Sequence, residues 1–209
     1  MKFKIIALGF ISTLCISLPA HAQFGGMSVP GMGGGSSGPA VNADELKKTV
    51  TNALVALAYA NSKYAKAVGN DSAASQLSEI GDKLKSGSLG VNADSISQLK
   101  TASENVTGEI KKRNDEKTKL SAEAKAAASE GVKFHVDGTL EGFKGAKQLK
   151  KAIESKSPAL IASLSSLKDV PIFLGEWAKA TTTIFSYLGS NGIDIKDADA
   201  SIKKAMSDG

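Results

Sequence analysis

Residues 158–188 read PALIASLSSLKDVPIFLGEWAKATTTIFSYL and form the most apolar stretch of this chain outside its first 22 residues. The stretch also holds the only tryptophan, Trp177. Pro158 and Pro171 divide it, and large apolar residues recur at three- and four-residue spacing in both parts, as on one face of a helix. The pattern predicts two helices that pack as a buried hairpin at the centre of the hydrophobic core.

The same stretch is a poor candidate for a membrane span. A spanning helix needs about twenty consecutive apolar residues, and charged side chains such as Lys168 and Glu176 interrupt this run. Two interpretations remain open beside the buried hairpin: a hairpin that inserts into a membrane, and a pocket for a hydrophobic ligand between these helices and their neighbours. For such a pocket we predict five ligand-contacting residues: Phe143, Leu164, Phe173, Trp177 and Phe185.

The first forty residues have the composition of an export signal followed by a linker. Lys2 and Lys4 precede an apolar run, and Ala20-His21-Ala22 is a small-x-small cleavage site, so residues 1–22 are interpreted as a bacterial secretory signal peptide. Residues 23–40 contain seven glycines and two prolines and are predicted to be a flexible linker. We expect a periplasmic or secreted protein without a transmembrane helix, folded as one all-α domain over residues 41–209.

Composition narrows the possible chemistry. Cleavage after residue 22 would leave no cysteine and a single histidine, His135, which excludes disulfides and cysteine-based redox or metal sites. No Gly-x-Ser-x-Gly motif is present, and we interpret His135 as a surface histidine. Arg113 is the only arginine, which is atypical of nucleic-acid binders. We therefore predict no catalytic residue, metal site or cofactor.

Helical periodicity dominates the first half of the folded region. Asn42 and Asn92 are good N-cap residues before apolar repeats. The pattern predicts a helix of about 25 residues with a narrow, coiled-coil-like seam, a second helix over 71–86, and a long third helix over 93–129. The third contains a highly charged segment that either projects into solvent or breaks near Asn114. Four residues there are the predicted contacts for an acidic protein partner: Lys111, Lys112, Arg113 and Lys117.

The remaining segments are predicted from shorter patterns. Residues 131–139 alternate apolar and polar side chains, which predicts an extended connector. Thr139 is expected to cap the next helix, with Asp197 or Asp199 capping a last short helix. The inner face predicted for the helix after Thr139 is Leu140, Phe143, Ala146, Leu149 and Ile153. Its lysine-rich outer face serves solubility or contacts an anionic lipid surface.

Together these elements predict an all-α fold. We expect an elongated bundle of six or seven helices, with long N-terminal helices and an apolar C-terminal hairpin. The lack of catalytic motifs favours an exported, non-catalytic protein that binds a protein partner or an envelope component. One alternative is a carrier of a hydrophobic small molecule or lipid in a pocket between helices. A further alternative is a membrane-active helical bundle.

Overall fold

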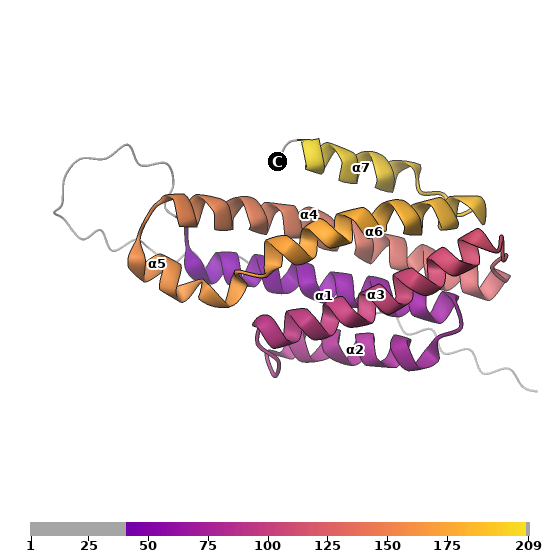
Figure 1. Cartoon of the computed structure of the whole chain (residues 1–209), viewed down its shortest axis with the longest axis horizontal. Helices are drawn as coiled ribbons and strands as arrows, with labels where there is room; N and C mark the ends of the chain where they lie inside the picture. The colour runs from indigo at the N-terminus through magenta and orange to yellow at the C-terminus, as the bar shows by residue number, and fades with distance from the viewer. Residues whose placement is uncertain (1–40, 208–209) are drawn as a thin grey trace, which may run out of the picture. The chain divides into compact units, whose positions relative to one another are not determined.

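A computed structural model describes residues 41–207 of the chain. The predicted signal peptide (1–22) and linker (23–40) lie outside the described residues. The described part is all-α, as the sequence predicts, and consists of seven α-helices and one short 3-10 helix (Figure 1). These are α1 (Ala43–Ala67), α2 (Asp71–Ser86), α3 (Ala93–Asp115), α4 (Ala122–Glu154), α5 (Pro158–Ser163), η1 (Ser165–Leu167), α6 (Val170–Ser190) and α7 (Lys196–Ser207).

Helix α1 is the centre of the core, and the prediction that residues 158–188 hold this place is wrong. Helices α2, α3 and α4 all pack on α1. Leu54, Ala58 and Ala65 lie outside the predicted seam but are buried too, so the apolar surface of α1 is wider than a narrow stripe. The predicted seam is buried as well and consists of Leu46, Val50, Ala53, Leu57, Ala60, Tyr64 and Ala67. The many alanines of α1 let neighbouring helices approach on several sides, which the apolarity of a segment alone does not reveal.

The predicted C-terminal hairpin has only one full-length arm. Helix α6 buries the periodic face that the sequence indicates, and it packs against α3 and α4. Helix α5 has six residues and none of them is buried. The chain between these helices returns through η1, whose Leu167 is buried. Helix α5 is therefore too short and too exposed to form a second arm, although Leu164, Leu167 and Val170 after it are buried.

The predicted third helix is two helices. Helix α3 ends at Asp115, Lys117 has a left-handed φ of 54°, and Ser121 caps the start of α4 with its side chain. Of the two alternatives predicted for the charged segment, the structure therefore shows the break near Asn114. The turn is held against the end of α6, because Leu120 donates its N–H to the Asn191 side chain and Tyr187 donates its hydroxyl to the Thr118 carbonyl.

The extended connector predicted for residues 131–139 is also wrong, since these residues lie in the middle of α4. Apolar and polar residues do alternate there, but the buried positions follow a heptad spacing instead. The side of α4 that faces the core consists of Ala128, Gly131, Val132, His135, Gly138, Thr139, Gly142, Gly145, Leu149 and Ala152. Four of these residues are glycines, which add nothing to a hydrophobic pattern. The alternation of the larger side chains in residues 131–139 therefore does not report which side of the helix is buried.

Helices α1 and α4 run antiparallel and side by side along most of their lengths (Figure 1). The glycines of α4 make this close approach possible. A Cβ on Gly138 would lie 2.7 Å from Leu57 Cδ2 and 3.0 Å from the backbone oxygen of Ala53. Gly131 meets the ring of Tyr64 in the same way, and Gly145 meets Val50. The large side chains of α1 thus fill space that α4 leaves free.

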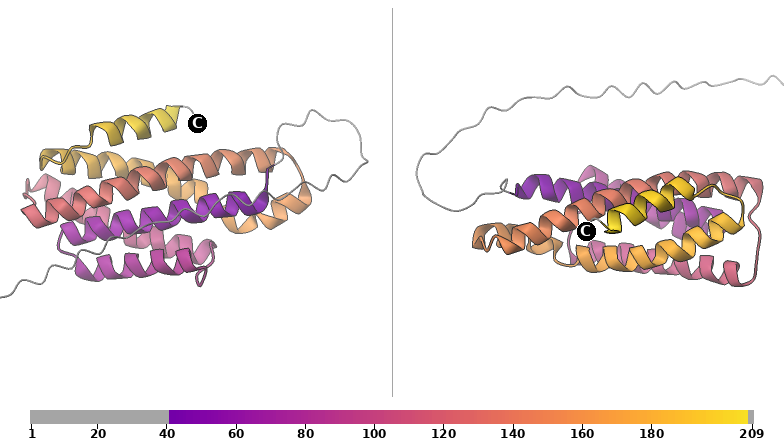
Figure 2. Two further views of the ribbon diagram at one scale, coloured as in Figure 1. Left: turned by 180° about the vertical axis from the view of Figure 1, so that it is seen from behind. Right: turned by 90° about the horizontal axis from the view of Figure 1, so that it is seen from above.

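Because the glycines face inward, the predicted inner face of the second half of α4 is largely on the outside. Leu149 is buried as expected, but Leu140 and Ile153 are exposed, and Phe143 and Ala146 are only half-buried. Helix α7 lies alongside this second face of α4 (Figure 2). Its first turn is closed by Asp194, which accepts the Lys196 N–H, rather than by the predicted Asp197 or Asp199.

Candidate ligand-binding groove

A polar cluster around His135 crosses the core between α1, α4 and α6. His135 is 0% exposed, so its interpretation as a surface histidine is wrong. Thr181 donates its hydroxyl proton to the Trp177 carbonyl, and its oxygen lies 2.9 Å from His135 Nε2. Nε2 must therefore be the protonated nitrogen, and Nδ1 accepts from the Tyr64 hydroxyl at 3.2 Å. Every ring nitrogen of this buried histidine has a partner.

The same burial determines the charge state of the cluster. Desolvation lowers the pKa of His135 to about 3 and raises the pKa of Tyr64 well above its ordinary value. The His135 ring lies 4.5 Å from that of Trp177, whose indole N–H donates to the Thr139 hydroxyl at 3.0 Å. The cluster is neutral, satisfied and closed to solvent. These hydrogen bonds fix how α1, α4 and α6 are aligned along one another, and they leave no polar group of the cluster free to contact a substrate.

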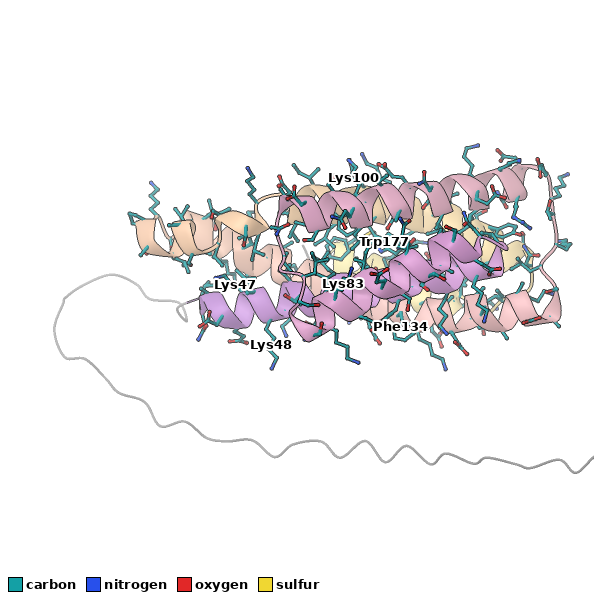
Figure 3. The ribbon with its side chains drawn as sticks, turned by 90° about the horizontal axis from the view of Figure 1, so that it is seen from below. Lys47, Lys48, Lys83, Lys100, Phe134 and Trp177 are labelled. Atoms are coloured by element: carbon teal, nitrogen blue, oxygen red, sulfur yellow. The ribbon has the colours of Figure 1, made fainter. Side chains whose placement is uncertain are left out.

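The five predicted ligand-contacting residues do not meet in one place. Leu164 and Phe185 are buried in the core. Phe173 and Trp177 lie beside a small cavity between α3 and α6, with Trp177 in the interior of the bundle (Figure 3). Phe143 lines a separate, larger groove on the far side of α6. Positions on these two sides of α6 are nearly 180° apart at 100° per residue, so one ligand cannot contact both sets.

The small cavity has a volume of about 190 Å³ and an ion pair at its edge. Lys100 Nζ lies 2.8 Å from both carboxylate oxygens of Glu176, and this hydrogen bond raises the pKa of Lys100. Ser103 Oγ and Thr107 Oγ1 are buried beside the cavity without a protein partner. Such hydroxyls are commonly satisfied by water, and a cavity of this size holds several water molecules.

The larger groove lies between α4, α6 and the end of α7 and has a volume of about 680 Å³. Apolar side chains from three helices form most of its surface, and charged side chains lie only along α4. Its lining residues are Phe143, Ala146, Lys147, Leu149, Lys150, Ile153, Glu154, Pro171, Ala178 and Met206. Helix α7 stops short of the end of α4 that leads into α5 (Figure 1).

Sequence reasoning found Phe143 but missed the rest of the groove. Pro171, Ala178 and Met206 come from segments distant in sequence, and Ile153 was assigned to the core. The heptad spacing of glycines along α4 is the signal that could have found the groove. It would have assigned the glycine side of α4 to close helix packing and left Phe143 and Ile153 on a second apolar side.

The residues predicted to bind an acidic partner lie at the end of α3 and in the following turn. Lys111, Lys112 and Lys117 are exposed. Lys111 pairs with Asp115 at 2.6 Å, and Arg113 donates to Glu109 and, through Nη2, to the Val68 carbonyl at the end of α1. Arg113 thus holds α1 and α3 together, and acidic neighbours offset the positive charge of this region.

Comparison of the chain with protein-family models, curated proteins and solved structures gives no match. Among the described helices, none is both long enough and apolar enough to cross a membrane. Residues 41–207 bring together no group of three or more histidine, cysteine, aspartate or glutamate side chains that could hold a metal ion. The groove between α4, α6 and α7 is the candidate functional site.

Proposed function

We propose that the protein is an exported, non-catalytic carrier that binds an anionic amphiphile in the groove between α4, α6 and α7. The observation that carries this proposal is the composition of the groove: an apolar floor from three helices, with two lysines and one acidic residue, Glu154, along the edge formed by α4. The predicted signal peptide motivates a location outside the cytoplasm. The proposal takes up the alternative of a carrier for a hydrophobic small molecule or lipid, in place of the expected binding of a protein partner or envelope component.

The dimensions of the groove suit one hydrocarbon chain. Its volume of about 680 Å³ is within the usual range for small-molecule sites, roughly 300–1,000 Å³. Each methylene group buried there would contribute about 0.8 kcal/mol to binding. Lys147 and Lys150 would contact a carboxylate or phosphate head group at the edge, where surface ion pairs contribute about 1 kcal/mol or less. The hydrocarbon chain of the ligand would supply most of the affinity, and the lysines would select for an anionic head group.

A protein partner at the end of α3 is supported less well. Lys111 already pairs with Asp115, Arg113 is held by Glu109 and the Val68 carbonyl, and Asp115 and Glu116 lie within the same segment. A steering surface for an acidic partner needs an excess of one sign of charge. The groove offers both apolar area and a basic edge, so it is the better candidate.

The test is a fluorescence titration with 11-(dansylamino)undecanoic acid as the probe. We expect saturable binding, displaced by dodecanoate more effectively than by dodecanol and not by dodecyltrimethylammonium. Ala178→Trp fills the groove and is expected to weaken probe binding at least tenfold. Ala180→Trp is the matched control, since Ala180 lies on the same helix but lines the small cavity.

The two tryptophan variants distinguish binding in the groove from binding in the small cavity. Loss of binding in Ala180→Trp with retention in Ala178→Trp would move the site to the small cavity and contradict the proposal. Lys150→Gln should reduce dodecanoate affinity up to about fivefold and leave dodecanol unchanged. Lys133→Gln, an exposed lysine elsewhere on α4, should change neither. No saturable binding of the probe to the unmodified protein would also overturn the proposal.

A further inference from the structure

The net charge of the described residues is concentrated in one short segment. Residues 144–172 contain six lysines and two acidic residues, whereas the rest of residues 41–207 contains 18 basic and 18 acidic residues. The net charge outside the segment is therefore zero. We call residues 144–172 the basic segment. It comprises the end of α4, all of α5 and η1, and the start of α6.

The basic segment also exposes large aliphatic side chains. Ile153, Ile161 and Ile172 are 55%, 42% and 62% exposed, and they are three of the five exposed large hydrophobic residues among those described. They come from the end of α4, from α5 and from the start of α6. The end of α4 and helix α5 lie at one end of the bundle, where the chain folds back, and α6 begins further in (Figures 1 and 2). Exposed isoleucines are costly in water, so three within the basic segment indicate a surface with a partner.

The start of α1 lies at the same end and does not cancel this charge (Figure 1). Its first two turns contain two acidic residues, Asp44 and Glu45, and two lysines, Lys47 and Lys48 (Figure 3). Within the basic segment, the acidic residues Glu154 and Asp169 are outnumbered three to one by lysines. The end of the bundle as a whole therefore keeps an excess of four positive charges.

The chemistry of this end fits a bilayer better than a macromolecular partner. Protein interfaces are enriched in arginine and depleted of lysine, and base-reading surfaces also use arginine. The basic segment has six lysines and no arginine. Flexible lysines around aliphatic side chains are typical of surfaces that rest in the head-group region of an anionic membrane. We propose that the basic segment docks the protein on the surface of an anionic bilayer.

Docking of this kind is peripheral and leaves the bundle intact. The three isoleucines are already exposed, so they can enter the head-group boundary without unpacking α6 from α3 and α4. Docking would also bring the groove close to the membrane, because Ile153 and Pro171, which belong to the basic segment, line the groove. That consequence rests on the proposed carrier function, whereas docking itself does not.

The test is cosedimentation of the purified protein with sucrose-loaded vesicles. We expect binding to vesicles of phosphatidylglycerol and phosphatidylcholine, little binding to phosphatidylcholine alone, and loss of binding at high salt. Replacing Lys150, Lys151 and Lys156 by glutamine should weaken binding about 100-fold. The matched control replaces three exposed lysines away from this end of the bundle, Lys66, Lys85 and Lys133, and should change binding less than threefold.

The apolar contribution is tested by a second matched pair. Ile161→Ser should weaken vesicle binding severalfold, and Leu140→Ser, at a residue of similar exposure outside the basic segment, should not. Both side chains are exposed, so both variants should fold. Equal binding to neutral vesicles, or equal effects of the two lysine triplets, would overturn the proposal. Ala178→Trp should keep vesicle binding while losing the dansyl probe, so failure of docking and failure of the carrier function are distinguishable.

Discussion

The two apolar sides of helix α4 differ in how their partner helices cover them. The side with Gly131, Gly138 and Gly145 is closed by α1, whose larger side chains would clash with a Cβ at Gly131 and Gly138 and crowd one at Gly145. The side with Phe143 and Ile153 has larger side chains of its own but is covered only in part by α7. The side with the smaller residues is the better buried of the two.

One side of α4 thus holds the helices together, and the other side is available to bind a ligand. Close packing needs complementary shapes, and glycine provides them where another helix fills the space. Large apolar side chains that stay half-exposed cost stability unless another molecule covers them. The glycine side therefore organises the fold, and the open side is where we place the ligand. Four measurements test this comparison.

The largest effect is expected on the closed side. Gly138→Val places methyl groups against Leu57 and the backbone oxygen of Ala53, neither of which can move without displacing α1. We expect the free energy of unfolding to fall by about 3 kcal/mol, measured by urea denaturation. Gly175→Ala is the control, because nothing lies within 4 Å of a Cβ at that helical position. It should raise stability by up to about 1 kcal/mol, and an equal loss in both variants would contradict close packing at Gly138.

The polar cluster beside the glycines predicts a dependence of stability on pH. The pKa of His135 is about 3 in the folded protein against an ordinary value of 6.5, so below pH 6.5 the unfolded chain binds a proton that the folded protein does not. Stability is complete above pH 6.5 and falls as the pH decreases toward 3, by about 2 kcal/mol between pH 8 and pH 5.

The control for this prediction is His135→Gln. Glutamine offers both a donor and an acceptor to Thr181 and Tyr64 but does not titrate. Urea denaturation at several pH values should show that the variant has lost the decrease between pH 8 and pH 5. If its profile equals that of the unmodified protein, His135 is not the group responsible.

A smaller and local effect is expected on the open side. Ile202 is the one buried residue of α7, so Ile202→Ala should weaken the docking of α7 on α4 by about 2 kcal/mol. Hydrogen exchange should show amides of α7 exchanging about 30-fold faster while those of α1 are unchanged. Leu54→Ala, in the core of α1, should instead lower the stability of the whole bundle. Equal acceleration in α1 and α7 for Ile202→Ala would mean that α7 is part of the cooperative core.

The smallest effect is expected for Phe143. Because this side chain is half-buried in an open groove, Phe143→Ala should lower the free energy of unfolding by about 1 kcal/mol. Phe173→Ala, at a position buried in the core, should cost about 3–5 kcal/mol. Thermal unfolding of the two variants measures the difference. Similar losses would show that the second side of α4 is as closed as the first.

Much of the fold follows from local signals. The N-caps Asn42 and Asn92, the glycine after α2 and the periodic face of α6 place helix boundaries within a few residues, because capping and amphipathicity act over one or two turns. The wrong predictions concern the part of α4 where glycines form the contact surface with the neighbouring helices. Residues 131–139 were predicted to be extended because their large side chains alternate, although the heptad that matters there is made of small residues.

By itself, the sequence determined an all-α bundle, the capping of its main helices and the concentration of positive charge in residues 144–172. These properties depend on residue type and spacing along the chain. The tertiary structure alone decided that α1 lies at the centre, that His135 is buried, and that Phe143 meets Pro171 and Met206 in one groove. Those outcomes depend on which helices approach closely enough to exclude water, and that is a property of pairs of surfaces far apart in the chain.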